Sequence, residues 1–207
     1  MKKYSIGIDL GGTKILIALI ERESGRVIDC IKKKTKKDKG PKNITKKMIE
    51  GIEELQANFD EVYSIGVGSA GQIDREKGII LAAPNLDCYD LNIKEILNSH
   101  FNIPVFVGND VEVAALGEQK FGAGKDCNDF ICIFVGTGVG SSIIKNGKII
   151  RGATGTAGEI GHMIVDLNGR QCACGGHGCL EAYASRSAIE RRIEGALKKG
   201  RKSCILE

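Results

Sequence analysis

Short runs of apolar residues, separated by glycine-rich or polar turns, open the chain and predict β-strands. The runs at 4–9, 15–20 and 26–31 follow one another closely, with turns at 11–14 and 23–25 between them. Successive strands joined by tight turns pair as antiparallel neighbours. We therefore expect a three-stranded antiparallel meander at the start of the chain.

Helical periodicity follows the meander. Within residues 43–59, apolar side chains recur at spacings of 4, 4 and 3, which places Ile44, Met48, Ile52 and Leu55 on one face of a helix. The same kind of pattern predicts further strands at 62–67 and 104–107 and further helices at 93–101 and 111–121. The first half of the chain is thus expected to mix strands with helices that bury one face.

The pattern begins again after the glycine-rich stretch at 121–124. Three strands and a final helix are predicted at 130–135, 139–144, 148–150 and 187–199. Asn146-Gly147 is a strong signal for a tight hairpin between the last two of these strands. Because this layout resembles the opening of the chain, we interpret the sequence as two related domains, 1–121 and 122–207. The second has few elements and is expected to be incomplete.

Composition and charge narrow the class of protein only a little. The chain has 207 residues, of which 42% are hydrophobic and 27% charged, and the net charge is +4. These values are typical of a globular protein. Most of the excess charge lies in the lysine-rich stretch 32–47, where no aromatic residue is interleaved to stack on bases. We interpret it as a solvated connection leading into a helix, and we expect no nucleic-acid partner.

Membrane insertion and secretion are not expected from this sequence. No apolar run approaches the length of about 18 residues that a membrane-spanning helix needs. The first residues, Met-Lys-Lys, lead directly into a strand that contains Asp9, without the apolar core of a signal peptide. We therefore expect a cytoplasmic protein.

The eight cysteines fall into a cluster and a scattered set. Cys172, Cys174 and Cys179 lie within eight positions of one another. The first two are one residue apart, which is poor geometry for a disulfide but good geometry for sharing a metal ion. The scattered five are expected to be reduced and mostly buried: Cys30, Cys88, Cys127, Cys132 and Cys204.

Three thiolates in a glycine-rich loop are three of the four ligands that tetrahedral zinc requires. The fourth could be His162, 10 positions before Cys172, or His177, inside the loop. We favour His162, because the reach of His177 to the same ion is cramped. Four protein ligands leave no open position, so the expected role of the zinc is structural.

Two glycine-rich turns are candidates for holding phosphate. One follows the carboxylate of Asp9, which could hold a metal ion through water, and its residues are Gly11, Gly12, Thr13 and Lys14. The other turn consists of Gly136, Thr137 and Gly138. Glycine permits close backbone approach, and exposed N–H groups carry partial positive charge. Either turn alone is more often only a turn. Two at matching places in two similar halves are expected to face one cleft and hold one nucleotide.

Asn109-Asp110 lies where a predicted strand ends and a helix begins. Asn and Asp are favoured as helix N-caps, and the local sequence alone favours that interpretation. The functional alternative is a general base that accepts the proton of an attacking hydroxyl.

Two glutamates flank the cysteine motif. Glu159 precedes His162 by three residues and Glu181 follows Cys179 by two. Carboxylates without a structural task are suited to accept hydrogen bonds from sugar hydroxyls. The simpler alternative is surface charge.

Together these motifs resemble the ROK family (repressors, open reading frames, kinases). The resemblance extends over nearly the whole chain and is carried by segments 9–14, 109–110, 136–140, 159–162 and 172–181. It implies an α/β protein of the actin-like, ribonuclease-H-like fold with two similar domains. It also implies a homo-oligomer, either a dimer or a tetramer.

The resemblance also implies residue roles. Asp110 would be the catalytic base, and the two glycine turns would hold the ATP phosphates with Asp9 near Mg²⁺. Zinc would be held by His162, Cys172, Cys174 and Cys179. Sugar contacts would come from Asn109, Asp110, Glu159, His162 and Glu181, with Gly71 and Asn85 as neighbours.

The expected function is ATP-dependent phosphorylation of a hexose, with glucose and its O6 as the default acceptor. The alternative is a sugar-responsive transcriptional regulator of the same family without its DNA-binding domain, and a more distant one is a zinc-binding interaction module. The sequence departs from the family pattern at Val111-Glu112, where Ala-Asn is usual. It also lacks the later segment that holds adenosine, so we expect weak or no ATP binding from this chain alone.

Overall fold

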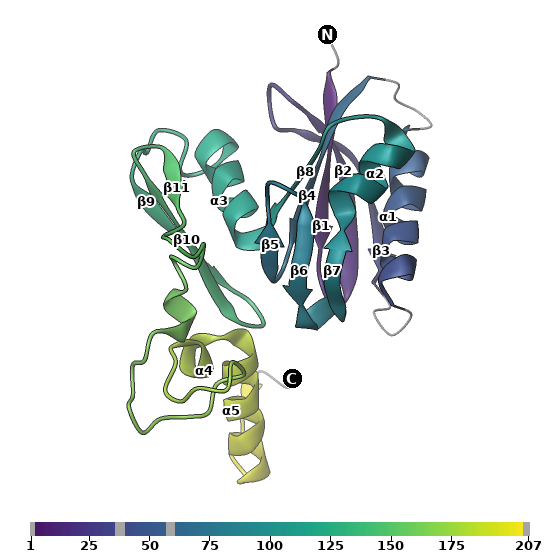
Figure 1. Ribbon diagram of the computed structural model, residues 1–207. Coiled ribbons are helices and arrows are strands. Elements are labelled where there is room, and N and C mark those ends of the chain that lie inside the picture. Colours follow the sequence, from purple (N-terminus) through teal and green to yellow (C-terminus); the bar gives the residue numbers. More distant parts are fainter. Residues whose placement is uncertain (1–2, 36–39, 57–60, 205–207) are drawn as a thin grey trace. The chain divides into compact units, whose positions relative to one another are not determined.

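The computed structural model describes residues 3–35, 40–56 and 61–204. The chain forms two compact units, Met1–Lys125 and Asp126–Glu207 (Figure 1). The glycine-rich stretch at 121–124 immediately precedes this division.

A five-stranded sheet forms the centre of the first unit, with strand order β3-β2-β1-β4-β8. The first three strands are antiparallel neighbours, which confirms the predicted meander. The last two run parallel to β1. The strands are β1 (Tyr4–Leu10), β2 (Lys14–Glu21), β3 (Val27–Lys34), β4 (Val62–Ser69) and β8 (Val105–Asn109).

Helices α1 (Pro41–Gln56) and α2 (Ile93–Phe101) contact each other and pack on the sheet. The predicted face of α1 is fully buried, as Ile44, Met48 and Ile52 show. These side chains join the inward-facing residues of β1 in one hydrophobic core. The helix begins at Pro41, earlier than predicted, because proline is well tolerated in the first turn of a helix. Part of the predicted C-terminal end, 57–59, lies outside the described residues.

Helix α3 (Asp110–Phe121) lies against β4 and β8. Gly68 and Gly108 permit this close approach. A Cβ atom on Gly68 would lie 2.6 Å from Val113, and one on Gly108 would lie 2.8 Å from it. Because these two glycines have no side chain, the first turn of α3 packs directly over the ends of the two strands.

A second, three-stranded sheet with order β5-β6-β7 belongs to the same unit and was not predicted. Its strands are β5 (Gln72–Asp74), β6 (Ile79–Ala83) and β7 (Cys88–Asn92), and the short 3₁₀ helix η2 (Pro84–Leu86) connects the last two. The strands are too short for a clear periodic signal. Long-range packing stabilises them instead, since Ile80, Leu86 and Cys88 are fully buried in the main core.

The second unit contains a three-stranded antiparallel sheet, as predicted. Asn146 and Gly147 both adopt positive φ, at 49° and 71°, which is the conformation a tight two-residue hairpin needs. Its elements are β9 (Phe130–Val135), β10 (Val139–Lys145), β11 (Lys148–Ile150), the 3₁₀ helix η3 (Ile160–His162), α4 (Glu181–Ala184) and α5 (Arg186–Lys198).

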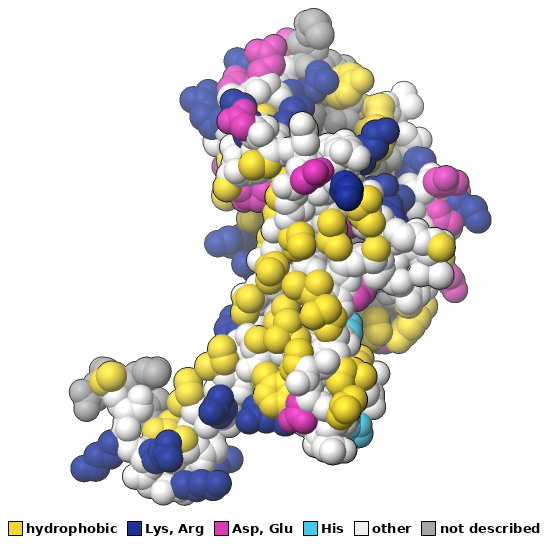
Figure 2. Space-filling view, turned by 90° about the vertical axis from the view of Figure 1, so that its left-hand side faces the viewer, with side chains coloured by type: hydrophobic (Ala, Val, Ile, Leu, Met, Phe, Trp, Pro, Cys, Tyr) yellow, Lys and Arg dark blue, Asp and Glu magenta, His cyan; other side chains and the backbone are white. Residues whose placement is uncertain are grey.

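The second unit buries few large apolar side chains among its described residues. Ile131, Ile133 and Val135 of β9 are 57%, 58% and 60% exposed, although all three are apolar. Met163, Ile164, Val165 and Leu167 are exposed as well. Figure 2 shows hydrophobic side chains gathered broadly on this unit. Its clearest buried cluster is small and contains Cys172, Cys179 and Ala182.

Two sequence-based interpretations need correction. Of the scattered cysteines, Cys88 is buried and Cys132 half-buried, but Cys30, Cys127 and Cys204 are exposed, so the prediction of mostly buried thiols is wrong. The lysine-rich stretch 32–47 is also not a single connection. Its ends belong to β3 and α1, and 36–39 lie outside the described residues.

Among the described residues, no helix has both the length and the apolar character needed to cross a bilayer.

Candidate functional site

The carboxyl ends of the three parallel strands in the first unit lie level with one another. Leu10 of β1 pairs with Ser69 of β4, and Ser69 pairs with Asn109 of β8. In open α/β sheets, ligands bind at this edge. The register therefore brings the turn after β1 and the start of α3 to one place.

The glycine turn after β1 is braced by a threonine that the sequence patterns did not single out. The Gly11 N–H donates to the carbonyl of Lys14 at 3.0 Å, which closes the turn. The hydroxyl of Thr35 donates to the Gly11 carbonyl at 2.6 Å, and its N–H donates to the Thr13 carbonyl at 3.0 Å. Thr35 is fully buried. No local signal identifies it, because its partners lie more than 20 residues away.

The same turn lies against helix η2. A Cβ atom on Gly12 would lie 2.9 Å from the Asn85 carbonyl oxygen, so only glycine fits there without a shift. Thr13, Lys14 and Asn85 are exposed. The predicted phosphate turn and the predicted sugar-contact residue Asn85 are thus neighbours.

Asn109 is the N-cap of α3, as the local sequence predicts. Its Oδ1 accepts hydrogen bonds from the N–H groups of Val111 at 3.0 Å and Glu112 at 3.2 Å. Its Nδ2 donates to the Gly71 carbonyl at 3.4 Å. Gly71 has φ +103°, and a Cβ atom there would clash with the carbonyl oxygen of Ala82. The conformation of Gly71 therefore supports the cap.

Asp110 is half-buried beside this cap. Burial raises the pKa of its carboxyl, and the negative charge of Asp9 raises it further, while a hydrogen bond from the Val111 N–H opposes both effects. That hydrogen bond measures 2.9 Å. A carboxylate with a raised pKa in such a position is suited to accept a proton from a substrate hydroxyl.

An ion pair that the sequence did not reveal ties α3 to the small sheet. Nε of Arg75 donates to Glu112 Oε2 at 2.9 Å, and Arg75 Nη2 donates to Glu112 Oε1. Glu112 is one of the two residues at which the sequence analysis expects a departure from the family pattern. The pair therefore gives the unusual residue a defined role in holding the segment around Gly71 to the start of α3.

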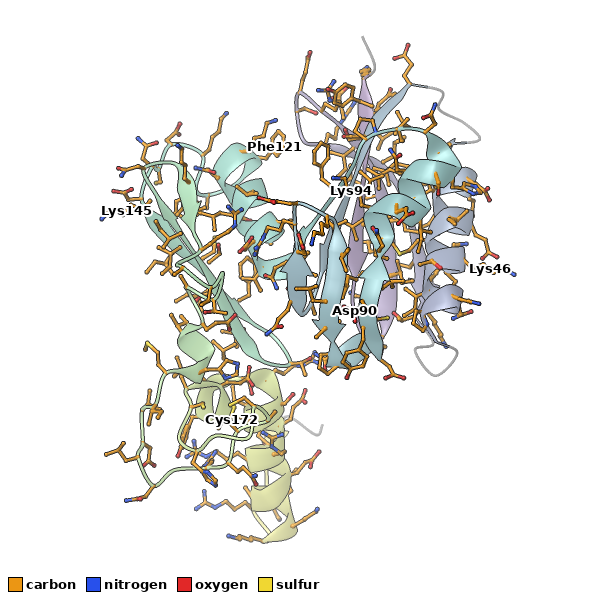
Figure 3. All side chains as sticks on the ribbon, viewed as in Figure 1. Lys46, Asp90, Lys94, Phe121, Lys145 and Cys172 are labelled. Atoms are coloured by element: carbon orange, nitrogen blue, oxygen red, sulfur yellow. The ribbon has the colours of Figure 1, made fainter. Side chains whose placement is uncertain are left out.

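The second unit gathers four potential metal ligands. The ligand atoms of His162, Cys172, Cys174 and Cys179 all lie within 4.8 Å of one another. Nδ1 of His162 lies 3.8 Å from the Cys172 sulfur, and the sulfurs of Cys174 and Cys179 are 3.8 Å apart. His177 is not in this group, and its backbone pairs with Gln171 instead. Figure 3 labels Cys172, which lies in the loop beside α4 and α5.

The donor set and the loop geometry fit a zinc ion. Three thiols and one imidazole are the ligands of a closed zinc site. Gly175 and Gly178 adopt φ of +92° and +74°, so the loop can turn around an ion. The N–H of Gly176 lowers the pKa of Cys174, whereas burial raises the pKa of Cys179 to about 11. Both thiols must lose their protons to bind a metal.

Glu181 connects this cluster to the second glycine turn. Its Oε2 accepts a hydrogen bond from the Val139 N–H at 2.9 Å, and its Oε1 lies 3.7 Å from the Cys172 sulfur. The interpretation of Glu181 as a carboxylate without a structural task is therefore wrong, because it links the turn to the metal ligands.

The turn itself, Gly136 to Gly138, is closed by a hydrogen bond from the Gly136 N–H to the Gly138 carbonyl at 2.9 Å. Arg186 holds it from the start of α5. The Arg186 N–H donates to the Gly136 carbonyl at 2.9 Å, and its guanidinium donates to the Thr137 hydroxyl at 3.4 Å.

Glu159 and His162 lie at the two ends of one 3₁₀ turn. The His162 N–H donates to the Glu159 carbonyl at 3.0 Å. Residues three apart in a 3₁₀ helix lie on the same side. Both residues are exposed.

The predicted site residues thus form two groups, one in each unit. The first unit gathers residues from the turn after β1, the small sheet and the start of α3, namely Asp9, Gly11, Gly12, Thr13, Lys14, Gly71, Asn85, Asn109 and Asp110. The second unit gathers residues around the thiols, namely Gly136, Thr137, Gly138, Glu159, His162, Cys172, Cys174, Cys179 and Glu181.

The strand order, the glycine turn after β1 and the carboxylate at the edge of the sheet define an α/β protein of the actin-like ATPase fold. The ROK family profile matches residues 5–207, and the chain belongs to the ROK family.

Relatives with two kinds of function resemble the chain. Glucokinase from Thermotoga maritima is 35% identical over 97% of the chain and 63% of its own length. A ROK family glucokinase from Streptomyces griseus, in complex with glucose and AMPPNP, matches with TM-score 0.82 and 36% identity, over 95% of this chain and 62% of its own. A ROK family transcriptional regulator, a homolog of the E. coli MLC protein, matches with TM-score 0.86 and 29% identity. The match covers 99% of this chain and 52% of the regulator's own. The chain therefore spans less than two thirds of each of these relatives.

Proposed function

We propose that this chain is the N-terminal part of a sugar kinase that transfers the γ-phosphate of ATP to a hexose, with glucose as the first candidate. The observation that carries the proposal is the half-buried Asp110, which lies at the edge of the sheet beside a glycine turn. Burial and the negative charge of Asp9 both raise the pKa of its carboxyl. The similarity to a glucokinase in complex with glucose and AMPPNP supports it.

Asp110 would act as the general base. It would accept the proton of the sugar hydroxyl, most simply O6, as that oxygen attacks the terminal phosphate. The Asn109 cap and the Gly71 carbonyl hold the backbone around Asp110, so the carboxylate needs little rearrangement before the reaction.

The two glycine turns would hold the phosphates of ATP. Their exposed backbone permits close approach of an anion, and the hydroxyls of Thr13 and Thr137 are exposed beside them. The exposed carboxylate of Asp9 would hold Mg²⁺, which neutralises phosphate charge when it is bound.

The sugar contacts proposed in the first unit are Asn109 and Asp110, with Gly71 and Asn85 nearby. Those proposed in the second unit are Glu159, His162 and Glu181. Glu159 and His162 are exposed on one side of a 3₁₀ turn, which leaves both accessible to hydroxyl groups. Glu181 already accepts one hydrogen bond through Oε2, so its contribution would come through Oε1.

A structural zinc ion would be held by His162, Cys172, Cys174 and Cys179. When bound, it would hold the loop and so fix the position of His162. Because Nδ1 of this imidazole lies nearest the Cys172 thiol, Nε2 is the nitrogen that could face a sugar.

The same proposal divides the chain into two actin-like domains, 1–121 with the base and 122–207 with the zinc loop. We also propose that the protein is a homo-oligomer.

The second candidate function is a sugar-responsive regulator, which the similarity to a ROK transcriptional regulator supports. Such a regulator needs the sugar contacts but not a base, and the raised pKa of Asp110 favours the kinase.

Phosphate transfer from ATP to a panel of hexoses, measured for the chain and for Asp110→Asn in parallel, tests the proposal. A kinase gives turnover that the variant loses, by a factor of about 10² to 10⁴ for a missing general base. Saturable sugar binding without turnover is the result expected of a regulator, or of a kinase that needs residues outside this chain. Equal turnover in both proteins would remove Asp110 from the mechanism.

A further inference from the structure

The glycine turn at 11–14 has most of its carbonyl oxygens bonded to groups within the protein. Thr35, which follows β3 and is fully buried, donates its hydroxyl to the Gly11 carbonyl at 2.6 Å and its N–H to the Thr13 carbonyl at 3.0 Å. The Lys14 carbonyl accepts the N–H of Gly11. Three of the four carbonyl oxygens in the turn therefore already have donors.

Two N–H groups of the same turn are in the opposite situation. Among the described residues, the N–H groups of Gly12 and Thr13 donate to no acceptor. The Gly11 carbonyl and the Gly12 N–H belong to one peptide group, and in a planar trans peptide these two point in opposite directions. Because the buried Thr35 hydroxyl holds that carbonyl, the Gly12 N–H points away from Thr35.

Helix α1 holds Thr35 itself in place. The Thr35 carbonyl accepts hydrogen bonds from Nδ2 of Asn43 at 3.3 Å and from Nζ of Lys47 at 3.5 Å. Thr35 thus uses its hydroxyl, its N–H and its carbonyl in hydrogen bonds to two different segments. A side chain fixed by its neighbours in this way can hold a ligand-binding backbone in one conformation.

We propose that Thr35 is a positioning residue for phosphate binding, which turns the Gly11 carbonyl away from the ligand and directs the Gly12 N–H at a phosphate oxygen of ATP. An N–H group attracts an anion, whereas a carbonyl oxygen in the same place would repel it. Without the hydroxyl, the peptide between two glycines is free to rotate. The inference rests on the proposed function, because it takes the turn to be a phosphate site.

Titration of the chain with MgATP, followed through its amide NMR signals, tests the proposal in three variants. Thr35→Val removes the hydroxyl and keeps the shape of the side chain, and Thr35→Ser restores a hydroxyl. Thr45→Val is the matched control. Thr45 is a buried threonine of α1 whose hydroxyl donates to the carbonyls of Pro41 and Lys42 in its own helix.

We expect the Kd for MgATP to rise about tenfold in Thr35→Val and to change by less than about twofold in Thr35→Ser and Thr45→Val. Rescue by serine would separate the effect of the hydroxyl from a general loss of structure. An unchanged Kd in Thr35→Val, or a Kd that rises as much in Thr45→Val, would overturn the proposal.

A second measurement needs no variant and so does not depend on the folding of Thr35→Val. In the wild-type chain, MgATP should shift the Gly12 amide proton downfield and slow its exchange with solvent, because this N–H gains a phosphate acceptor. The Gly11 amide should move less, since it already donates to Lys14. No shift at Gly12, at concentrations that detect millimolar affinity, would overturn the proposal.

The positioning role and the proposed base can fail separately. Asp110→Asn should lose phosphate transfer but keep the Gly12 shift and the Kd for MgATP. Turnover that survives in Asp110→Asn, with the Gly12 shift intact, would remove the base and leave the role of Thr35 standing. Turnover that depends on Asp110, with an unchanged Kd for MgATP in Thr35→Val, would remove the role of Thr35 alone.

Discussion

At the scale of single residues, Asp110 combines a raised pKa with a place at the end of a sheet. Burial is the main cause, and the charge of Asp9 adds to it. A folded-state pKa above the unfolded value means that the folded chain binds this proton more tightly. Ionised Asp110 therefore destabilises the fold at neutral pH, and this cost disappears as the pH falls below the ordinary aspartate pKa of about 3.9.

Asp110→Asn should consequently raise the melting temperature at pH 7. The gain should shrink as the pH falls, since the wild-type carboxyl then becomes neutral as well. Thermal unfolding of the wild-type chain and of Asp110→Asn, at several pH values from 7 to 4, measures this difference in melting temperature. Asp90→Asn, which neutralises an exposed carboxylate on β7, serves as the control and should leave the melting temperature nearly unchanged. A lower melting temperature for Asp110→Asn at pH 7 would show that the carboxylate stabilises the fold.

At the scale of elements, α3 and the small sheet are held together at the site by two links. One is the hydrogen bond from Asn109 to Gly71, and the other is the ion pair of Arg75 with Glu112. Gly71 and Arg75 directly flank strand β5. The small sheet therefore acts as a support for the cap that precedes Asp110.

Gly71→Ala should weaken this support. The residue has φ +103°, and the new Cβ would lie 2.9 Å from the Ala83 Cα and would clash with the Ala82 carbonyl. We expect a loss of about 1–3 kcal/mol in the free energy of unfolding, together with weaker sugar binding. Urea unfolding and calorimetric sugar titration measure the two effects.

Gly117→Ala is the matched control for this change. Gly117 lies inside α3, and an added methyl group would meet no heavy atom within 4 Å outside the helix's own backbone. Alanine should therefore stabilise the helix by about 0.5–1 kcal/mol. If Gly71→Ala behaves like Gly117→Ala, the backbone at Gly71 is not constrained as described.

At the scale of the whole molecule, the two units differ in what stabilises them. The first has one large hydrophobic core between its sheet and two helices. The second has a small buried cluster around two of the thiols and exposes much of the apolar surface of β9. A unit with so little buried apolar surface depends strongly on cross-links or metal.

Removal of metal should therefore unfold the second unit selectively. After treatment with a zinc chelator, amide hydrogen exchange should accelerate in 162–186 and stay slow in β1 and β4. Because the thiols must be deprotonated to bind, metal affinity should also fall as the pH is lowered. Cys174→Ser should show the same faster exchange when no chelator is added. Unchanged exchange in 162–186 after complete metal removal would show that the loop is stable by itself.

The sequence by itself determined the parts of this protein that local patterns encode. The opening meander, helix α1, the β10–β11 hairpin and the Asn109 cap follow from periodicity and from the conformational preferences of Gly and Asn within a few residues. The spacing of the three cysteines likewise indicated a metal loop, because ligands close in sequence need only a short turn to meet.

Only the tertiary structure decided the rest. The small sheet, the Thr35 brace, the Arg75–Glu112 pair and the link from Glu181 to Val139 all join residues that lie far apart in the sequence. The level ends of β1, β4 and β8 likewise depend on a strand register that parallel pairing sets over about 100 residues. Such contacts form because the hydrophobic core aligns the strands, and no local pattern records which distant side chains that alignment brings together.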